Sequence, residues 1–415
     1  MMARPLDPLL PEQRAATQPE ELIWLSASAG TGKTQVLTAR VLRLLMRPGV
    51  APDHILCLTF TKAGAAEMAS RIQERLAAWV QMPDKDLRKD LFAIGEGTDD
   101  AALARARTLF ASVIDAPGGG LRIQTIHSFC QTVLASFPVE AGLIPGFRPL
   151  EEREQATLRR EALAAMLSEA ESDGRRAIIG HVQDLALRLG EEKATQFLYR
   201  CGQYQERLEK ITGSFPSALR QHFQLPLGVP DQWLVANVID DRIDRPGLEA
   251  ISAANAAWGT KTGLDHADII AGWLGAGAEQ RAAYLGDLHR TLVTGQGTLQ
   301  AIYAKQLADV GDLAARLAES LGTWLATRQR MALSDAIAGA LEAGRDYAHV
   351  YGGFKRARGL VDFDDLIART VDLLFDGKLA EWVRFKLDQR TDHILVDESQ
   401  DTNANQWAIV NALIA

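Results

Sequence analysis

The sequence predicts an α/β fold, in which a parallel sheet is wrapped by helices and interrupted by a large all-helical insertion. Four short apolar segments, each ending in polar residues, have the pattern of buried parallel strands, at 22–26, 54–60, 122–126 and 393–396. A helical pattern follows each of the first three of these segments, at 34–45, 63–79 and 128–137. Alternating strands and helices build a parallel sheet whose ligands bind at the carboxyl ends of the strands.

The helical insertion is predicted from a change in composition. From about residue 150 to 345 the chain is rich in Ala, Leu, Glu, Arg and Gln at helical spacing, with almost no β-branched runs. Because the fourth strand follows this stretch, the α/β domain resumes near residue 346. We therefore expect an α/β domain made of two segments, 1–148 and 346–415, with a helical domain at 149–345.

Composition limits the class of protein. The 415 residues, 47% of them hydrophobic, are enough for two or three domains. The sequence contains no apolar run of membrane-spanning length and no secretory signal, so we expect a cytoplasmic protein without a membrane partner. Its net charge of −8 argues against a uniformly basic nucleic-acid coat, and any DNA contact should be confined to one face and helped by base stacking.

Three cysteines, Cys57, Cys130 and Cys201, are too few and too scattered for a disulfide framework or a zinc site. We expect each to be a small buried thiol.

A phosphate-binding loop follows the first predicted strand. Residues 27–34 read Ala-Ser-Ala-Gly-Thr-Gly-Lys-Thr, the P-loop pattern with Ala27 in place of its first glycine. Successive main-chain amides there can point at phosphates, at the positive end of the next helix. The alternative is an ordinary strand-to-helix turn. The loop predicts these ATP contacts: Ser28, Ala29, Gly30, Thr31, Gly32, Lys33 and Thr34.

An acidic pair near the other end of the chain supplies the complementary chemistry. The last predicted strand ends in Asp397 and Glu398. Asp397, together with the Thr34 hydroxyl, is predicted to bind Mg²⁺, and Glu398 to act as the base for an attacking water. The predicted catalytic residues of an ATPase that uses ATP and Mg²⁺ are thus Lys33 and Glu398. A solvated strand end is the alternative for the acidic pair alone.

Further motifs resemble a known family. They are the segments 58–68, Leu-Thr-Phe-Thr-Lys-Ala-Gly-Ala-Ala-Glu-Met, and 125–129, Thr-Ile-His-Ser-Phe, together with 361–367, Val-Asp-Phe-Asp-Asp-Leu-Ile, and Gln400-Asp401-Thr402 with Gln406. These motifs resemble those of the UvrD/RecB-like superfamily 1 DNA helicases, and most of all their AddA branch of helicase-nuclease subunits. The motifs extend along the whole chain except for the helical insertion.

The resemblance implies a fold and a function. Residues 1–148 and 346–415 would form the RecA-like P-loop domain 1A, and residues 149–345 the helical accessory domain 1B. The function implied is the N-terminal part of an ATP-dependent 3′-to-5′ helicase in recombinational repair of DNA double-strand breaks, located in the cytoplasm at the nucleoid. The partners implied are single-stranded DNA, duplex DNA ends and an AddB-like subunit.

The resemblance also assigns site residues. It makes Gln13 the residue that reads adenine and adds Gln400 to the ATP contacts, while Gln35 stands where several relatives carry an arginine. Alternatives remain: a solvated Gln13, a core position for Phe60 and a satisfied core histidine at position 127. Contacts with single-stranded DNA are implied for Phe60, Thr61, Lys62, Thr125 and His127.

A second acidic cluster does not predict a metal site. Asp362, Asp364 and Asp365 fit a solvated helix start, where acidic residues favour the helix dipole. The preceding Lys355, with Arg356 and Arg358, fits an ordinary charged helix face better than a DNA contact.

Two functions remain open from the sequence. The first is the helicase motor, whose second RecA-like domain and nuclease domain would lie beyond residue 415, so that the chain alone should bind ATP weakly, hydrolyse it barely and unwind nothing. The second is a non-catalytic nucleotide-binding switch within a DNA-repair complex. The presence of Glu398 argues against the switch, because a switch does not need a carboxylate that activates water.

Overall fold

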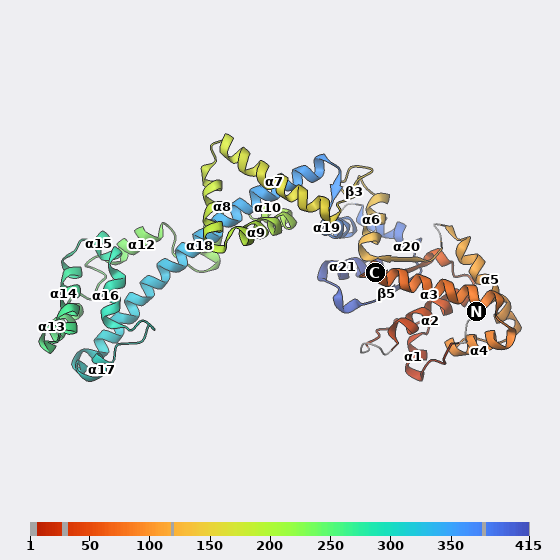
Figure 1. The fold of residues 1–415 in the computed structure, drawn as a ribbon, viewed down its shortest axis with the longest axis horizontal. Coiled ribbons are helices and arrows are strands. Elements are labelled where there is room, and N and C mark those ends of the chain that lie inside the picture. The colour runs from red at the N-terminus through yellow and green to blue at the C-terminus, as the bar shows by residue number, and fades with distance from the viewer. Residues whose placement is uncertain (1–5, 27–31, 118–119, 376–378, 415) are drawn as a thin grey trace. The chain divides into compact units, whose positions relative to one another are not determined.

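The computed structural model describes residues 6–26, 32–117, 120–375 and 379–414. The chain divides into two units, which Figure 1 shows along the colour ramp. Unit 1 comprises Met1–Gln155 and Lys355–Ala415, and unit 2 comprises Ala156–Phe354. The fold is largely helical and contains a small parallel sheet, as expected for the α/β class.

The sheet of unit 1 has three parallel strands in the order β2-β1-β5. The strands are β1 (Ile55–Thr59), β2 (Arg122–Thr125) and β5 (His393–Val396), which confirms three of the four predicted strands. All five residues of the central strand β1 are buried, as a continuous apolar run requires. A second parallel pair joins β3 (Arg148–Pro149) to β4 (Leu360–Val361).

The prediction of a strand at 22–26 is wrong. This segment has no strand assignment, and Leu22 and Trp24 are 91% and 72% exposed. An apolar run becomes a strand only when a neighbour completes its hydrogen-bond ladder, and in the described residues the ladder of β5 runs to β1. The Trp24 ring instead stacks on that of Trp407, with centroids 5.8 Å apart.

Helices cover both faces of the sheet. Ile55 and Cys57 of β1 contribute to a core with α2 to α5, while Leu56 and Leu58 contribute to a core with α6 and α19 to α21, because successive strand residues point to opposite faces. The ranges of α2, α3 and α6 confirm three predicted helices. The helices of unit 1 are α1 (Pro11–Ala16), α2 (Lys33–Met46), α3 (Lys62–Gln81), α4 (Asp84–Ile94), α5 (Asp100–Ile114), α6 (Ile126–Ser136), α19 (Phe363–Phe375), α20 (Ala380–Asp388) and α21 (Ala404–Ile414).

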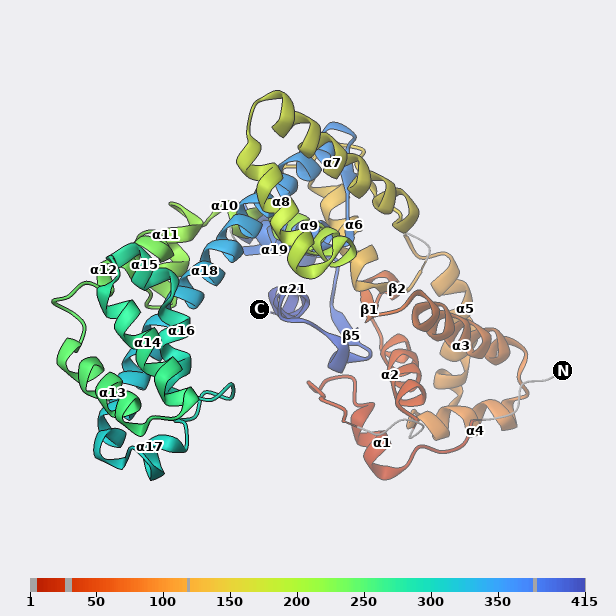
Figure 2. The same ribbon diagram turned by 60° about the vertical axis from the view of Figure 1, so that its left-hand side comes forward.

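Unit 2 is helical. Its main core lies between α13, α14, α16 and α18, and includes Leu248, Ile270, Leu288 and Leu321 (Figure 2). Two helices cross the unit boundary: α7 (Glu152–Ser172) and the 47-residue α18 (Gly311–Ala357). The others are α8 (Arg176–Leu189), α9 (Glu191–Gln203), α10 (Gln205–Glu209), α11 (Phe215–His222), α12 (Pro230–Asn237), α13 (Arg245–Trp258), α14 (Lys261–Gly275), α15 (Ala278–Ala283), α16 (Leu285–Leu292) and α17 (Ile302–Lys305).

No helix in the described part of the chain has both the length and the apolar character needed to cross a membrane. All three cysteines are buried thiols, as predicted. Burial, with a smaller contribution from Asp397, raises the pKa of Cys57 to about 12.

Candidate functional site

The carboxyl ends of the three strands are level. Thr59 of β1 pairs with Thr125 of β2, and Leu58 of β1 pairs with Val396 of β5. The residues that follow each strand therefore emerge along one edge of the sheet, which is the edge that binds ligands in open α/β sheets. This register brings together the segments that begin at Phe60, Ile126 and Asp397.

Threonines begin the helices at this edge. The Thr61 hydroxyl accepts a hydrogen bond from the Gly64 amide at 2.9 Å and caps α3, while the Thr125 hydroxyl accepts one from the Ser128 amide at 3.2 Å and caps α6. Each cap satisfies an amide that the first helical turn would leave unpaired. Both helix starts are thereby fixed at the sheet edge.

The residues predicted to contact DNA differ in exposure. Thr61 and Lys62 are exposed and Phe60 is half-buried, whereas Thr125 is buried in its capping role. The half-buried His127 packs edge-to-face on Phe363, with ring centroids 5.2 Å apart. Its burial lowers the pKa of His127, and Asp364 partly opposes this shift.

The acidic pair follows β5 directly. The Asp397 amide donates to the Leu58 carbonyl at 2.9 Å, which extends the ladder by one bond. Burial raises the pKa of Asp397, and the neighbouring Glu398 raises it further, while Lys33 opposes both effects. Crowded carboxylate oxygens of this kind fit a hard divalent cation such as Mg²⁺.

Glu398 adopts an unusual backbone conformation. Its φ of +53° lies in the left-handed region, which costs a residue with a Cβ about 1 kcal/mol or more. Its amide donates to Asp397 Oδ1 at 3.0 Å, and its carboxylate accepts a hydrogen bond from the Gln400 amide. The strained turn thus holds the two carboxylates side by side, with Gln400 bound to the second.

A cavity of about 600 Å³ joins the two halves of the predicted site. Lys33, Asp397, Glu398 and Gln400 line it together with apolar residues that include Trp24 and Trp407. This volume lies in the range of sites for small molecules and cofactors. The predicted contacts Ser28, Ala29, Gly30 and Thr31 lie outside the described residues.

The start of α2 meets the helix that carries Gln13. Lys33 and Thr34 open α2, where the helix dipole favours negative charge. Gly32 before them has φ +87°, and a Cβ there would lie 3.3 Å from Gln13 Nε2. The Gln13 amide therefore lies against the end of the phosphate-binding loop, and its Oε1 accepts the Leu10 amide at 3.0 Å.

The cluster around Asp362 differs from the sequence prediction. Lys355 and Asp362 are 5% and 1% exposed, so neither lies on the charged helix face or solvated helix start that was predicted. Lys355 Nζ donates to Asp362 Oδ2 at 2.9 Å and to Asp365 Oδ2 at 2.6 Å. Although burial lowers it, the two carboxylates raise the pKa of Lys355 above its usual value. Arg356 and Arg358 are exposed, as predicted.

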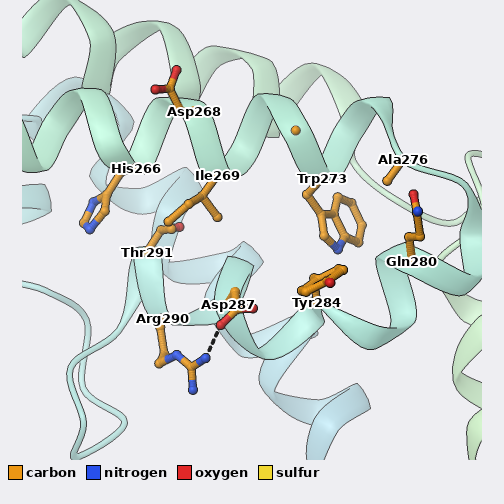
Figure 3. A pocket seen from close by; sticks show the side chains of 11 residues that line it. His266, Asp268, Ile269, Trp273, Ala276, Gln280, Tyr284, Asp287, Arg290 and Thr291 are labelled. Atoms are coloured by element: carbon orange, nitrogen blue, oxygen red, sulfur yellow. Dashed lines mark hydrogen bonds and ion pairs between the residues drawn. The ribbon is translucent and has the colours of Figure 1, made fainter.

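A second cavity, of about 510 Å³, lies in unit 2 between α14 and α16. Figure 3 shows Trp273 facing Tyr284 across it, with Arg290 paired to Asp287. The described lining of this cavity includes none of the residues predicted for ATP or DNA, so it is separate from the predicted site.

Comparison with known proteins gives a consistent result. The family model described as the UvrD/REP helicase N-terminal domain matches residues 9–415. Proteins named as the A subunit of an ATP-dependent helicase/nuclease are similar over most of this chain: one from Listeria monocytogenes is 24% identical over 95% of the chain and 34% of its own length, and one from Desulforamulus reducens is 26% identical over 96% and 33%. A third, from Moorella thermoacetica, is 34% identical over 43% of the chain and 11% of its own length. The chain therefore spans about a third of the length of the first relatives.

Proposed function

Because this chain belongs to the UvrD/REP helicase family, we propose that it forms the ATP-binding part of a DNA helicase motor that acts in DNA repair. The observation that supports this most is the cavity lined by Lys33, Asp397, Glu398 and Gln400. One positive and two negative side chains, brought together from opposite ends of the sequence, match the requirements of a magnesium–triphosphate complex.

We assign the following roles to the residues. Lys33 neutralises the β and γ phosphates, Thr34 and Asp397 hold Mg²⁺, and Glu398 accepts the proton of the attacking water. Mg²⁺ bridges the phosphates and withdraws charge from the bond that breaks. Gln400 orients the Glu398 carboxylate through its hydrogen bond, and Gln13 reads the adenine. The amides of residues 28–32 bind the phosphates.

The DNA side of the motor lies along the same edge of the sheet. Phe60 stacks on a base, while Thr61 and Lys62 at the start of α3 bind a phosphate. Thr125 fixes the start of α6, so that His127 faces the strand. In this proposal unit 1 corresponds to domain 1A, unit 2 to the helical domain 1B, and translocation runs 3′ to 5′.

The relatives are named as one lettered subunit of a helicase/nuclease, which supports a partner, and we propose an AddB-like protein with single-stranded and duplex-end DNA as the further ligands. The site of action would be the cytoplasm, at the nucleoid. A non-catalytic nucleotide switch is the competing proposal. The geometry disfavours it, because Glu398 is held in a strained turn beside the metal-binding carboxylate.

The test is ATP turnover stimulated by single-stranded DNA in a form of the protein extended to the length of its relatives. Lys33→Ala should abolish nucleotide binding, while Glu398→Gln should bind ATP and lose at least about 100-fold in turnover, as expected for a missing general base. Lys261→Ala, an exposed substitution in unit 2, is the control. Nucleotide binding without DNA-stimulated turnover in the unsubstituted extended protein would establish the switch instead.

The 415-residue chain should show the binding step alone. An arginine finger supplied by another domain contributes about 10³- to 10⁵-fold to the rate in related phosphoryl-transfer enzymes. The proposal therefore expects weak ATP binding, slow hydrolysis and no strand separation by this chain, measured with a fluorescent ATP analogue and a duplex-unwinding assay.

A further inference from the structure

Helix α1 carries Gln13 but has only six residues. A helix this short is not stable by itself in water, so contacts with the rest of the unit must hold it in place. Two arginines of α2 bind its carboxyl end. Arg40 Nη1 donates to the Ala16 carbonyl at 3.3 Å, and Arg43 Nη1 lies 3.5 Å from the Arg14 carbonyl.

Arg43 makes the more extensive contacts of the two. It is 5% exposed, and its Nη1 donates to Thr17 Oγ1 at 2.7 Å and its Nη2 to Gln18 Oε1 at 3.2 Å. Its Nε donates to Glu96 Oε1 at 3.0 Å. A guanidinium presents its donors in a rigid planar fork, so these contacts fix position as well as compensating charge.

The turn after α4 is shaped to admit this guanidinium. Gly95 has φ +87°, and a Cβ there would lie 3.0 Å from Arg14 Nε and 3.5 Å from Arg43 Nη1. The next residue, Glu96, supplies the carboxylate that pairs with Arg43. Arg43 therefore binds the end of α1, the start of the following segment and the turn after α4 at the same time.

The position of α1 determines where the Gln13 amide lies. Gln13 is one turn before the residues that Arg43 binds, and its Nε2 lies against Gly32, which directly precedes Lys33. A shift of α1 would move this amide away from the loop end, while Lys33 on α2 would stay in place.

We infer that Arg43 is the positioning residue for nucleotide-base selection: it holds α1 so that Gln13 meets an adenine rather than a guanine. The inference rests on the proposed ATP site. Arg43 touches no phosphate-binding residue among its described partners, so its loss should weaken recognition of the base and leave phosphate binding unchanged.

The experiment measures the affinities of the full chain for magnesium complexes of fluorescent ATP and GTP analogues. Arg43→Met should weaken ATP binding about tenfold, the equivalent of one well-placed hydrogen bond, and change GTP binding by less than about twofold. Arg43→Lys, which keeps the charge without the fork, should fall between the two proteins. Arg47→Met, a substitution of a partly exposed arginine just after α2, is the matched control and should change neither affinity.

A purely structural role would lower both affinities together, so an unchanged ATP-to-GTP ratio in Arg43→Met overturns the inference. Gln13→Ala should give the same change in ratio, and adding Arg43→Met to it should change the ratio no further, because both substitutions remove one interaction. A further additive loss would contradict the role assigned to Arg43.

Thr17→Val decides the case if Arg43→Met does not fold. It removes one acceptor of the Arg43 fork and should lower the ATP-to-GTP ratio about threefold, with an unchanged ratio overturning the inference. If the unsubstituted chain binds ATP and GTP equally well through Lys33, the inference fails and the proposed site stands. If no binding depends on Lys33, the proposed function itself fails, and this inference with it.

Discussion

The two units bury charge in different ways. In unit 1 the carboxylate is buried together with the cation, since Asp90 pairs with Arg75 and Asp362 with Lys355, and both carboxylates are almost fully inaccessible. In unit 2 Arg220 and Arg281 are buried, but their carboxylate partners reach solvent: 41% of the Asp335 side chain and 67% of the Asp240 side chain are exposed.

Main-chain carbonyls replace the buried carboxylate in unit 2. Arg281 donates to the carbonyls of Trp273 at 3.1 Å and Leu274 at 2.5 Å, and its guanidinium lies over the Trp273 ring. A carbonyl stays neutral when its donor is removed, whereas a buried carboxylate is left as an unpaired charge. Unit 1, which holds the proposed site, should therefore respond more strongly to the loss of a single polar partner.

The largest effect should follow Lys355→Met. The substitution leaves Asp362 buried without its cation, so the free energy of opening α19 should fall by about 3 to 5 kcal/mol, as for other broken buried pairs. Hydrogen exchange of the α19 amides measures this directly. Arg356→Met, at the exposed neighbouring position, should change it by less than about 0.5 kcal/mol, and equal effects of the two substitutions would contradict a buried pair.

Two tryptophans allow a matched test of the comparison. Trp79 Nε1 donates to the buried Asp90 carboxylate at 2.6 Å, and Trp273 Nε1 donates to the neutral Arg281 carbonyl at 2.8 Å. Trp79→Phe should destabilise its unit by about 2 kcal/mol and Trp273→Phe by about 1 kcal/mol, because bonds to charged acceptors are worth more. Urea unfolding of the two variants gives both values, and the reverse order would remove the distinction between the units.

The Lys355 cluster also predicts a dependence on pH. Because its folded pKa is raised, its contribution to stability is fully present below the ordinary value of 10.5 and is lost as pH rises through the folded pKa. Within that window the unfolding free energy of unit 1 should fall by up to about 1.4 kcal/mol per pH unit. Denaturation at pH 9 to 12 should show this slope in the unsubstituted protein, at about those values, and a parallel curve for Lys355→Met would refute it.

The smallest effect belongs to the exposed partner in unit 2. Asp335→Asn keeps a hydrogen-bond acceptor for Arg220 at a partly solvated position, so it should cost about 0.5 kcal/mol. Thermal unfolding against Lys355→Met gives the contrast. A loss comparable to that of Lys355→Met would mean that unit 2 depends on its ion pairs as strongly as unit 1.

Much of the sheet could be predicted because its information is local. The strands at Ile55–Thr59 and His393–Val396 are apolar runs that end in polar residues, and the threonines before α3 and α6 are ordinary helix caps. The segment at 22–26 has the same local pattern. Whether such a run pairs depends on the strand beside it, which periodicity does not encode.

The acidic and basic residues near position 360 were misjudged for a related reason. A charge pattern in the sequence says which side chains are ionised but not which are buried, and the rule that charges are solvated fails when a cation and two carboxylates are brought together. The Lys355 cluster and the approach of Gln13 to Gly32 are both tertiary contacts. Of the site itself, the acidic pair and Lys33 were predicted to act together, and they line one cavity.

The unpaired segment at 22–26 bears on how the protein behaves when it is concentrated. It presents the exposed side chains of Leu22 and Trp24, and it lines a cavity together with β5, an edge strand in the described sheet. Free strand edges beside apolar segments are where one molecule adds to the sheet of another. Storage at high concentration should therefore favour oligomers that form through this edge, and a lysine at position 24 should keep the preparation monodisperse for longer.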